Sequence, residues 1–240
     1  MISTENQPSN GTVNNKDFSL ESYKELLKFA KKNWVFSTYK NIDFSRNNIF
    51  WRHDVDYSLE KSLILSGIES DLGVKATYFL NLHSDFYNVL ARSEIELINA
   101  IRDHGHEFGI HFDSSFYNIE NETDLSKALE KQLAIFKSVF SFELSAFSFH
   151  NPTNQNFSFE KPKYANLVNC YSDFFKNEIN YCSDSNGYWR YKSIKETLTL
   201  NKNNSIQVLT HPGWWGDKFF GAPRERIYRI TSDRQKRLMK

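Results

Sequence analysis

Short apolar segments rich in β-formers alternate along the chain with longer segments whose apolar residues recur at helical spacing. The expected strands are 48–51, 74–80, 107–110, 146–149 and 206–210, with weaker ones at 167–170 and near residue 181. The expected helices follow Ser19, span 58–72, open at Ser93 and run through 125–136. Strand–helix alternation with short connections predicts parallel βαβ units, arranged as a barrel or as a doubly wound sheet.

Local signals mark where several of these helices begin and end. Ser93 and Glu96 have the spacing of a capping box, which predicts the start of a helix at that point. Gly73 follows the segment 58–72 at the position where a helix commonly ends in a left-handed residue. Because no linker splits the pattern and 240 residues can bury one large core, we expect one domain over 18–240.

Residues 1–17 are polar and rich in Asn, Ser and Thr, and we expect them to form a disordered leader. They carry no basic segment followed by an apolar one, so a secretory signal is not expected. The sequence has no run of about 18 apolar residues, so a membrane span is not expected.

The formal net charge of +1 argues against nucleic acid and anionic membranes as partners. Cys170 and Cys182 are too few for a disulfide framework or a thiolate zinc site, and a cytoplasmic protein is expected.

Polar residues of metal-binding and catalytic type come directly after the expected strands. They are Asp54 and Asp56, Asn81 and His83, His111 and Asp113, His150, and His211. The carboxyl ends of parallel strands lie on one side of an α/β fold, where active sites form. Five separate segments would therefore bring their polar side chains to one place.

The segment 52–56 reads Arg-His-Asp-Val-Asp and carries two carboxylates two residues apart. In extended backbone such residues point to the same side, so Asp54 and Asp56 are expected to share one space. Two neighbouring carboxylates repel unless a cation or a proton separates them, and a divalent metal on one leaves the other free as a base. The alternative is structural. Asp56 would then cap the following helix, and Asp54 would pair with Arg52.

Three later segments each deliver a histidine to the same end of the fold. His111 ends a short strand, where imidazole is a common zinc ligand, whereas His106 precedes that strand and belongs to its opposite end. His150 ends an apolar strand that Pro152 prevents from continuing. His211 follows a buried strand and precedes Pro-Gly-Trp-Trp, whose indoles suit contact with a sugar ring or an acyl methyl and equally suit ordinary packing.

Taken in order, these motifs resemble the polysaccharide deacetylase family, which is carbohydrate esterase family four with the NodB-homology fold. The matching parts are an aspartate-rich first strand, Gly-His-Glu-x-Gly-x-His over 105–111, a strand ending before x-Pro, and Leu-x-His over 209–211. The Arg-His-Asp-Val-Asp opening resembles a divergent branch found in bacterial surface-polysaccharide gene clusters. Over roughly residues 48–216, the resemblance implies a distorted (β/α) barrel of about seven parallel strands with one divalent metal, usually zinc.

Carried over by position, Asp54 matches the family's general base and Asp56 its metal-binding carboxylate. His111 matches the first histidine ligand, and His211 matches the general acid. The family's two aspartates are adjacent, whereas Val55 separates them here. The division of roles between the two carboxylates therefore stays open, including its reversal.

The family's second histidine ligand, four residues after the first, is replaced by Ser115. His150 is the first choice for the missing metal ligand, and Asp113 is the second. His150 also stands where the family has an arginine that orients the base, a charge that Arg52 can supply instead. The residues expected to contact substrate are Arg52, Asp113, Asp184, Arg190 and Trp214.

The resemblance implies a metal-dependent N-deacetylase acting on an amino sugar, with Zn²⁺ as the expected cofactor. Asp54 would take a proton from the attacking water, and His211, oriented by Asp184, would protonate the departing amine. Without an export signal, the expected substrate is a nucleotide- or lipid-linked precursor in surface-polysaccharide (O-antigen) biosynthesis. The alternatives are a deformylase or amidase acting on another C–N bond, and a catalytically degenerate barrel that binds glycans, which the serine at 115 favours.

Overall fold

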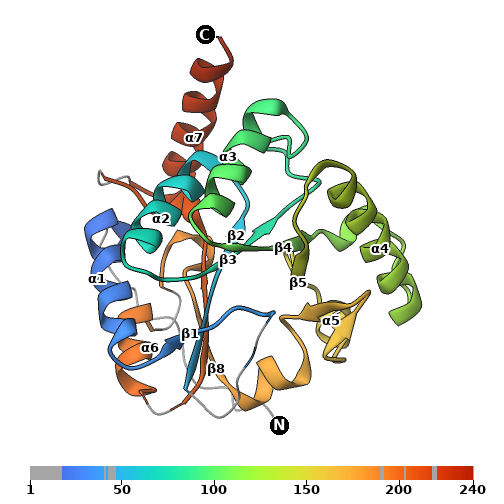
Figure 1. Ribbon diagram of the computed structural model, residues 1–240, viewed down its shortest axis with the longest axis horizontal. Helices are drawn as coiled ribbons and strands as arrows, with labels where there is room; N and C mark the ends of the chain where they lie inside the picture. The colour runs from blue at the N-terminus through green and yellow to red at the C-terminus, as the bar shows by residue number, and fades with distance from the viewer. Residues whose placement is uncertain are drawn as a thin grey trace.

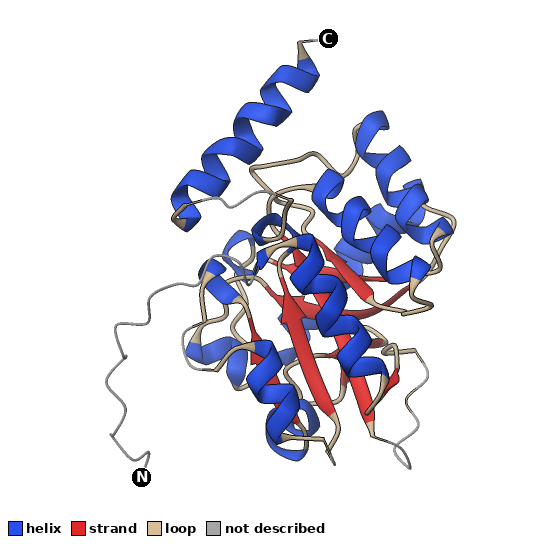
Figure 2. Cartoon of the chain, turned by 90° about the vertical axis from the view of Figure 1, so that its left-hand side faces the viewer, coloured by secondary structure: helices blue, strands red, loops and turns tan. Residues whose placement is uncertain are grey.

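The computed structural model of the protein describes residues 18–40, 42, 47–189, 192–202, 204–217 and 221–239 (Figures 1 and 2). The expected leader 1–17 and Arg190 lie outside the described residues. Within these ranges, no helix combines the length and the apolar character that crossing a bilayer requires.

A nine-stranded sheet forms the centre of the fold, with helices around it (Figure 1). The strands are β1 (Val35–Phe36), β2 (Asn48–Val55), β3 (Thr77–Leu80), β4 (Glu107–Phe112), β5 (Leu144–Phe149), β6 (Lys163–Tyr164), β7 (Leu167–Asn169), β8 (Asn180–Ser183) and β9 (Ile206–Thr210). The α-helices are α1 (Leu20–Lys31), α2 (Leu59–Asp71), α3 (Arg92–Asp103), α4 (Glu122–Val139), α5 (Asn154–Phe157), α6 (Ile194–Leu200) and α7 (Pro223–Leu238). Short turns of other helical types are η2 (Ser114–Phe116), η3 (Phe174–Glu178), η4 (Ser185–Gly187) and η5 (Pro212–Trp214).

Seven strands run parallel in the order β7-β5-β4-β3-β2-β9-β8. β6 pairs antiparallel with β7 at one edge, and β1 pairs parallel with the start of β2. From β2 to β5 each strand lies beside its predecessor, and the chain later returns to the other side of β2 through β9. This mostly parallel sheet with flanking helices confirms the predicted α/β class and is consistent with a (β/α)-barrel-like arrangement.

Two strands reach further than the sequence pattern predicts. β2 continues to Val55 and β4 to Phe112. The reason is that β3 and β9 flank β2 and pair with it as far as Val55 and His53, respectively. Asp54 and His111 therefore lie inside strands, where Asp54 pairs with Phe79 of β3 and His111 with Ser148 of β5.

Alternate residues of β2 face opposite layers. Trp51 and Val55 pack in the large core between the sheet and the helices. Phe50 points the other way, into a smaller cluster of mainly aromatic side chains. Because side chains alternate along a strand, Arg52 and Asp54 share the inner face with Phe50.

Serine side chains open the first two helices. Ser19 Oγ accepts a hydrogen bond from the backbone N of Ser22 at the start of α1. Ser58 Oγ does the same for Lys61 at the start of α2. α2 is followed by Gly73, whose φ of 62° is the left-handed conformation that the sequence predicts there. Ser58, and not Asp56, is therefore the cap of this helix.

The capping box predicted at Ser93 does not form, because α3 starts earlier. It begins after Ala91, which makes no side-chain hydrogen bond to the helix. Glu94 thereby falls in the first turn, where it is buried and pairs with Arg234 and Arg237 of α7. α7 otherwise projects from the body of the molecule (Figure 2). A long-range ion pair thus sets this helix start in place of the local signal.

Candidate active site

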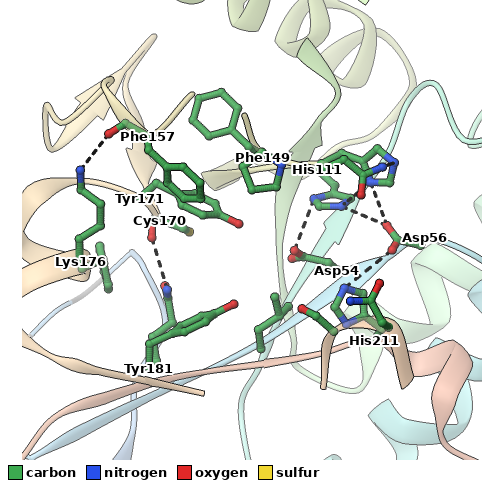
Figure 3. A pocket seen from close by; sticks show the side chains of 18 of the residues that line it. Asp54, Asp56, His111, Phe149, Phe157, Cys170, Tyr171, Lys176, Tyr181 and His211 are labelled. Carbon is green, nitrogen blue, oxygen red and sulfur yellow. Dashed lines mark hydrogen bonds and ion pairs between the residues drawn. The ribbon is translucent and has the colours of Figure 1, made fainter. Parts of the chain in front are cut away.

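A cavity of about 630 Å³ opens at the carboxyl ends of the strands, and its lining falls into two walls (Figure 3). One wall carries the acid and imidazole groups of Asp54, Asp56, His111, His150 and His211. Across the open space lie aromatic rings and one lysine, contributed by Phe157, Tyr171, Lys176 and Tyr181. The polar residues after four of the predicted strands therefore meet, as their position in the sequence predicts.

Three ligand-type atoms from separate elements converge on the first wall. Asp56 follows β2, His111 lies in β4 and His150 follows β5. Asp56 Oδ1 lies 3.0 Å from His111 Nε2 and 3.3 Å from His150 Nδ1. The two histidine nitrogens are 3.0 Å apart. Among the described residues, these three side chains form the group that is placed to hold a metal ion.

The unsatisfied atom of this group is Asp56 Oδ1. It is buried, and in the described part of the chain no hydrogen bond reaches it, although two imidazoles lie beside it. Burial alone would raise the pKa of Asp56, but the neighbouring His111 and His150 outweigh burial and hold that pKa well below its ordinary value. A buried, ionised carboxylate between two imidazoles fits a divalent cation, and three protein ligands with a further position open are typical of catalytic zinc sites.

Asp54 lies beside this group with both carboxylate oxygens engaged. Its Oδ2 accepts a hydrogen bond from Arg52 at 3.0 Å, and its Oδ1 accepts one from Ser148 Oγ at 3.2 Å. Arg52 is fully buried, with its guanidinium 5.5 Å from the ring centroid of Phe79 and 5.3 Å from that of Tyr171. These contacts fix the orientation of Asp54 at the cavity surface.

His211 faces Asp56 from another side, and Asp184 holds it there. His211 Nε2 lies 3.8 Å from Asp56 Oδ2 (Figure 3), while its Nδ1 lies 2.6 Å from Asp184 Oδ1. Trp215 Nε1 donates to the other oxygen of Asp184 at 2.8 Å. Burial alone would lower the pKa of His211, but the hydrogen bond to Asp184 and its charge outweigh burial and raise that pKa to about 9. This imidazole is therefore protonated at neutral pH and can act as an acid.

The residues predicted to contact substrate divide between the cavity and the layer behind it. Trp214 lines the cavity. Arg52 and Asp184 are fully buried behind Asp54 and His211, so they reach a ligand only through those two side chains. Arg52 and Asp184 therefore lie where they orient Asp54 and His211, the other role considered for each in the sequence, and not at the cavity surface.

Asp113 lies outside the cavity lining as well. Its Oδ1 accepts hydrogen bonds from the backbone N and the hydroxyl of Ser115, because Asp113 caps the turn η2. Ser115, at the position of the family's second histidine, is bonded in that turn and is not among the residues that line the cavity. His150 lies in the metal-binding group, whereas Asp113, the second choice, does not. Arg190 is outside the described residues.

The polar residues after β3 do not join the cavity. His83 stacks on Phe116, with ring centroids 3.9 Å apart, and contacts the hydroxyl of Tyr117. Asn81 accepts a hydrogen bond from the backbone of His83, which closes a local turn. His106 is buried and lies before β4, at the strand end opposite the site, as the sequence predicts. Four segments, and not the expected five, therefore build the site.

The sequence pattern does not single out Ser148 or the aromatic wall. Ser148 Oγ lies 2.8 Å from His111 Nδ1 and 3.2 Å from Asp54 Oδ1. A signal exists, because Ser148 comes two residues before His150 and residues two apart in a strand share a face. The wall comes from 157–181, where little hydrophobic periodicity is present to place its rings.

No protein-family model matches the sequence, and no curated protein matches it. Solved structures that are similar to this chain include a family 4 carbohydrate esterase pseudoenzyme from Bacillus anthracis, at 12% identity and a TM-score of 0.45. The match covers 80% of this chain and 61% of that protein, so the chain spans less than two thirds of its length.

Two further solved structures are similar over more of their own length. One is a family 4 acetyl xylan esterase from Clostridium thermocellum in complex with a cobalt ion, at 12% identity and a TM-score of 0.42, covering 79% of this chain and 83% of that one. The other is a chitin deacetylase from the fungal pathogen Colletotrichum lindemuthianum, at 15% identity and a TM-score of 0.39, covering 77% of this chain and 81% of that one.

Proposed function

We propose that this protein is a metal-dependent hydrolase that removes an N-acetyl group from an amino sugar. The observation that carries the proposal is the buried, unsatisfied Oδ1 of Asp56 between His111 and His150. A carboxylate, Asp54, and an imidazole with a raised pKa, His211, flank this group. A metal-binding group between a base and an acid has the parts that amide hydrolysis requires.

Asp54 acts as the general base. Arg52 and Ser148 each occupy one of its oxygens, which leaves lone pairs free to accept a proton from a water molecule attacking the acyl carbon. A divalent metal on the three ligands, best matched by Zn²⁺ because they are two imidazoles and a carboxylate, supplies the Lewis acid that polarises the acyl carbonyl.

His211 acts as the general acid. Its Nδ1 is tied to Asp184, so its Nε2 is the atom that can deliver a proton. The proton goes to the sugar nitrogen as the C–N bond breaks, because an amine departs poorly as an anion. One water is consumed, and the products are acetate and the free amino sugar.

The aromatic wall supports a sugar as substrate. Rings of Phe157, Tyr171 and Tyr181 lie across the cavity from the metal-binding group (Figure 3), where they can pack against a pyranose face. A volume of about 630 Å³ lies within the range of about 300–1,000 Å³ that is usual for small-molecule sites. Together with the motif resemblance, this favours an amino sugar on a small carrier, such as a nucleotide- or lipid-linked precursor.

The test is acetate release by the purified full chain loaded with Zn²⁺. Substrates are N-acetylated amino sugars in free, nucleotide-linked and oligomeric form, with N-formyl analogues to detect a deformylase. Asp54→Asn and His211→Ala should each lower kcat by about 10²–10⁴-fold. His83→Ala removes an imidazole outside the cavity and should keep the wild-type rate. Turnover that survives unchanged in Asp54→Asn would contradict the proposed mechanism.

The second candidate is a barrel that binds a glycan without turnover. Ser115 in place of the second histidine is the feature that favours it, whereas His150 beside Asp56 and His111 favours the enzyme. The binding barrel predicts that the wild type binds an acetylated sugar and releases no acetate, with or without Zn²⁺. Elemental analysis of the wild type gives the first discrimination, because the enzyme requires about one divalent ion per chain.

A further inference from the structure

Ser148 in β5 connects the general base to a metal ligand through one buried hydroxyl. Its Oγ lies 2.8 Å from His111 Nδ1 and 3.2 Å from Asp54 Oδ1, and its side chain is fully buried. We infer that Ser148 is a positioning residue that decides which nitrogen of His111 carries the proton and so couples Asp54 to metal binding. The inference rests on the proposed function, because it concerns the same metal and the same base.

The direction of the first hydrogen bond follows from the charge of Asp54. Its Oδ2 forms a buried ion pair with Arg52 at 3.0 Å. An ionised carboxylate only accepts hydrogen bonds. Ser148 has a single hydroxyl proton, and that proton must point at Asp54 Oδ1. Ser148 Oγ can therefore only accept a hydrogen bond from its other neighbour, His111, through a lone pair.

The second hydrogen bond then fixes the tautomer of His111. Its Nδ1 lies 2.8 Å from Ser148 Oγ, and Ser148 has no second proton to donate, so Nδ1–H is the donor. A neutral imidazole carries one N–H, which leaves Nε2 with a lone pair. That lone pair lies 3.0 Å from the unsatisfied Asp56 Oδ1. The chain Arg52–Asp54–Ser148–His111 therefore presents Nε2 ready for a metal.

A cation can take the place between these atoms. His111 Nε2 lies 3.0 Å from Asp56 Oδ1 and 3.0 Å from His150 Nδ1, so a divalent metal would contact all three atoms. Hydrogen bonds behind a ligating histidine commonly change metal affinity by about 10–100-fold.

A purely structural serine would fill space in β5, and Asp54→Asn separates the two possibilities. An amide at 54 can donate to Ser148 Oγ, which frees the serine hydroxyl to turn toward His111 Nδ1. The proton of His111 then moves to Nε2, the atom that should bind the metal. Asp54→Asn should therefore weaken metal binding partly through Ser148, although residue 54 is not a ligand.

The experiment is a double-mutant cycle on Zn²⁺ affinity, measured by competition with a chromophoric chelator on the metal-free full chain. The four proteins are the wild type, Ser148→Ala, Asp54→Asn and the double variant. Ser148→Ala should weaken Zn²⁺ binding by about 10–100-fold. Asp54→Asn should weaken it by a larger factor in the wild type than in the Ser148→Ala background. Ser145→Ala is the matched control, because Ser145 lies in the same strand and its hydroxyl donates to the backbone O of Phe108, away from His111 and Asp54.

The outcomes separate this inference from the proposed function. If the wild type binds Zn²⁺ and Ser148→Ala binds it equally well, Ser148 does not position His111, while the proposed function stands. Equal factors for Asp54→Asn in both backgrounds would also overturn the coupling. A wild type that binds no Zn²⁺ would overturn both. Should Ser148→Ala not fold, Ser148→Cys takes its place, because a thiol is a weak donor of similar size.

Discussion

Two buried clusters of carboxylate and imidazole groups lie on opposite faces of the sheet at β2. The cluster on the helix side contains Glu69, His53, His106, Tyr23 and Tyr78. The cluster on the cavity side contains Asp56, His111 and His150. Both combine an acid with two imidazoles, and residue type alone does not tell them apart.

The helix-side cluster has a partner for each carboxylate oxygen. Glu69 Oε1 accepts from the hydroxyl of Tyr23 and lies 2.6 Å from His53 Nε2. Glu69 Oε2 accepts from the hydroxyl of Tyr78 at 2.7 Å. The second nitrogen of His53 lies 2.7 Å from Thr210 Oγ1. Among the described residues, both carboxylate oxygens of Glu69 and the ring nitrogens of His53 and His106 have partners, and these groups serve the packing of α1 and α2 on the sheet.

The cavity-side cluster differs in one atom. Among the described residues, no hydrogen bond reaches Asp56 Oδ1, although it is buried. Buried polar atoms are nearly always hydrogen-bonded, so an exception beside two imidazoles calls for a cause. The comparison shows that the cavity-side cluster is distinguished by a buried oxygen without a hydrogen bond, Asp56 Oδ1, and not by the presence of Asp and His.

The largest expected effect comes from truncating the central acid of each cluster. Asp56→Ala should abolish Zn²⁺ binding and lower the unfolding free energy of the metal-free chain by less than Glu69→Ala does, because fewer buried hydrogen bonds are lost. Glu69→Ala should keep the Zn²⁺ site and lower the unfolding free energy by about 3–5 kcal/mol, because it strands buried partners. Elemental analysis and denaturant unfolding measure the two quantities. Equal destabilisation by both substitutions would make the cavity cluster structural too.

Asp184 is a useful third case, because both of its carboxylate oxygens are hydrogen-bonded and it still orients His211 at the cavity. Asp184→Asn should lower kcat by up to about 10²–10⁴-fold, the range for losing an acid catalyst. It should also move the alkaline limb of the pH–rate profile to lower pH. The sign follows because Asp184 raises the pKa of His211 to about 9, and without that charge His211 loses its proton earlier. An unchanged alkaline limb would exclude His211 as the acid.

The smallest expected effect is on the pH dependence of stability, to which the helix-side cluster should contribute. Burial lowers the pKa of His106 below 6.5. Burial alone would raise the pKa of Glu69, but His53 and the hydrogen bonds outweigh it and lower that pKa below 4.5. In both cases the unfolded chain binds more protons, so unfolding free energy falls as pH drops below about 6.5 and again below about 4.5.

Glu69→Gln isolates the acidic part of that dependence. The variant lacks the carboxyl, so its unfolding free energy should change less between pH 5 and pH 3 than that of the wild type, starting from a lower value. Asp113→Asn, which changes a carboxyl at the surface turn η2, should leave the slope of the wild type intact. Denaturant unfolding at several pH values measures both. A slope in Glu69→Gln equal to that of the wild type would place the acid sensitivity elsewhere.

Much of the sheet could be predicted from the sequence, because strand and helix periodicities are strong between β2 and β5. The exceptions are long-range effects. β2 runs on through Asp54 because β3 pairs with it there, and α3 starts early because Glu94 meets two arginines of α7. Neither partner is visible in a local pattern.

The candidate site could be predicted where chemistry and position coincide. Asp56, His111 and His150 are ligand types at strand ends, and they meet as a group. Asp113 is also a possible ligand at the end of a strand, yet its carboxylate accepts hydrogen bonds within the turn η2. Ser148 has no distinctive type, and its role depends on two neighbours that the sequence does not place beside it. Only the folded structure, with the strands in register, shows which of these residues reach the site.

The position of β9 beside β2 has a consequence for synthesis on the ribosome. His53 and Thr210 bond across 157 positions of sequence, so β2 lacks one neighbour until β9 has emerged. During that interval β2 to β5 can pair with one another while one edge of β2 stays open to other chains. Contacts so distant in sequence also slow the final closure. We therefore expect a nascent chain truncated before β9 to depend on chaperones, and His211 to join the site last.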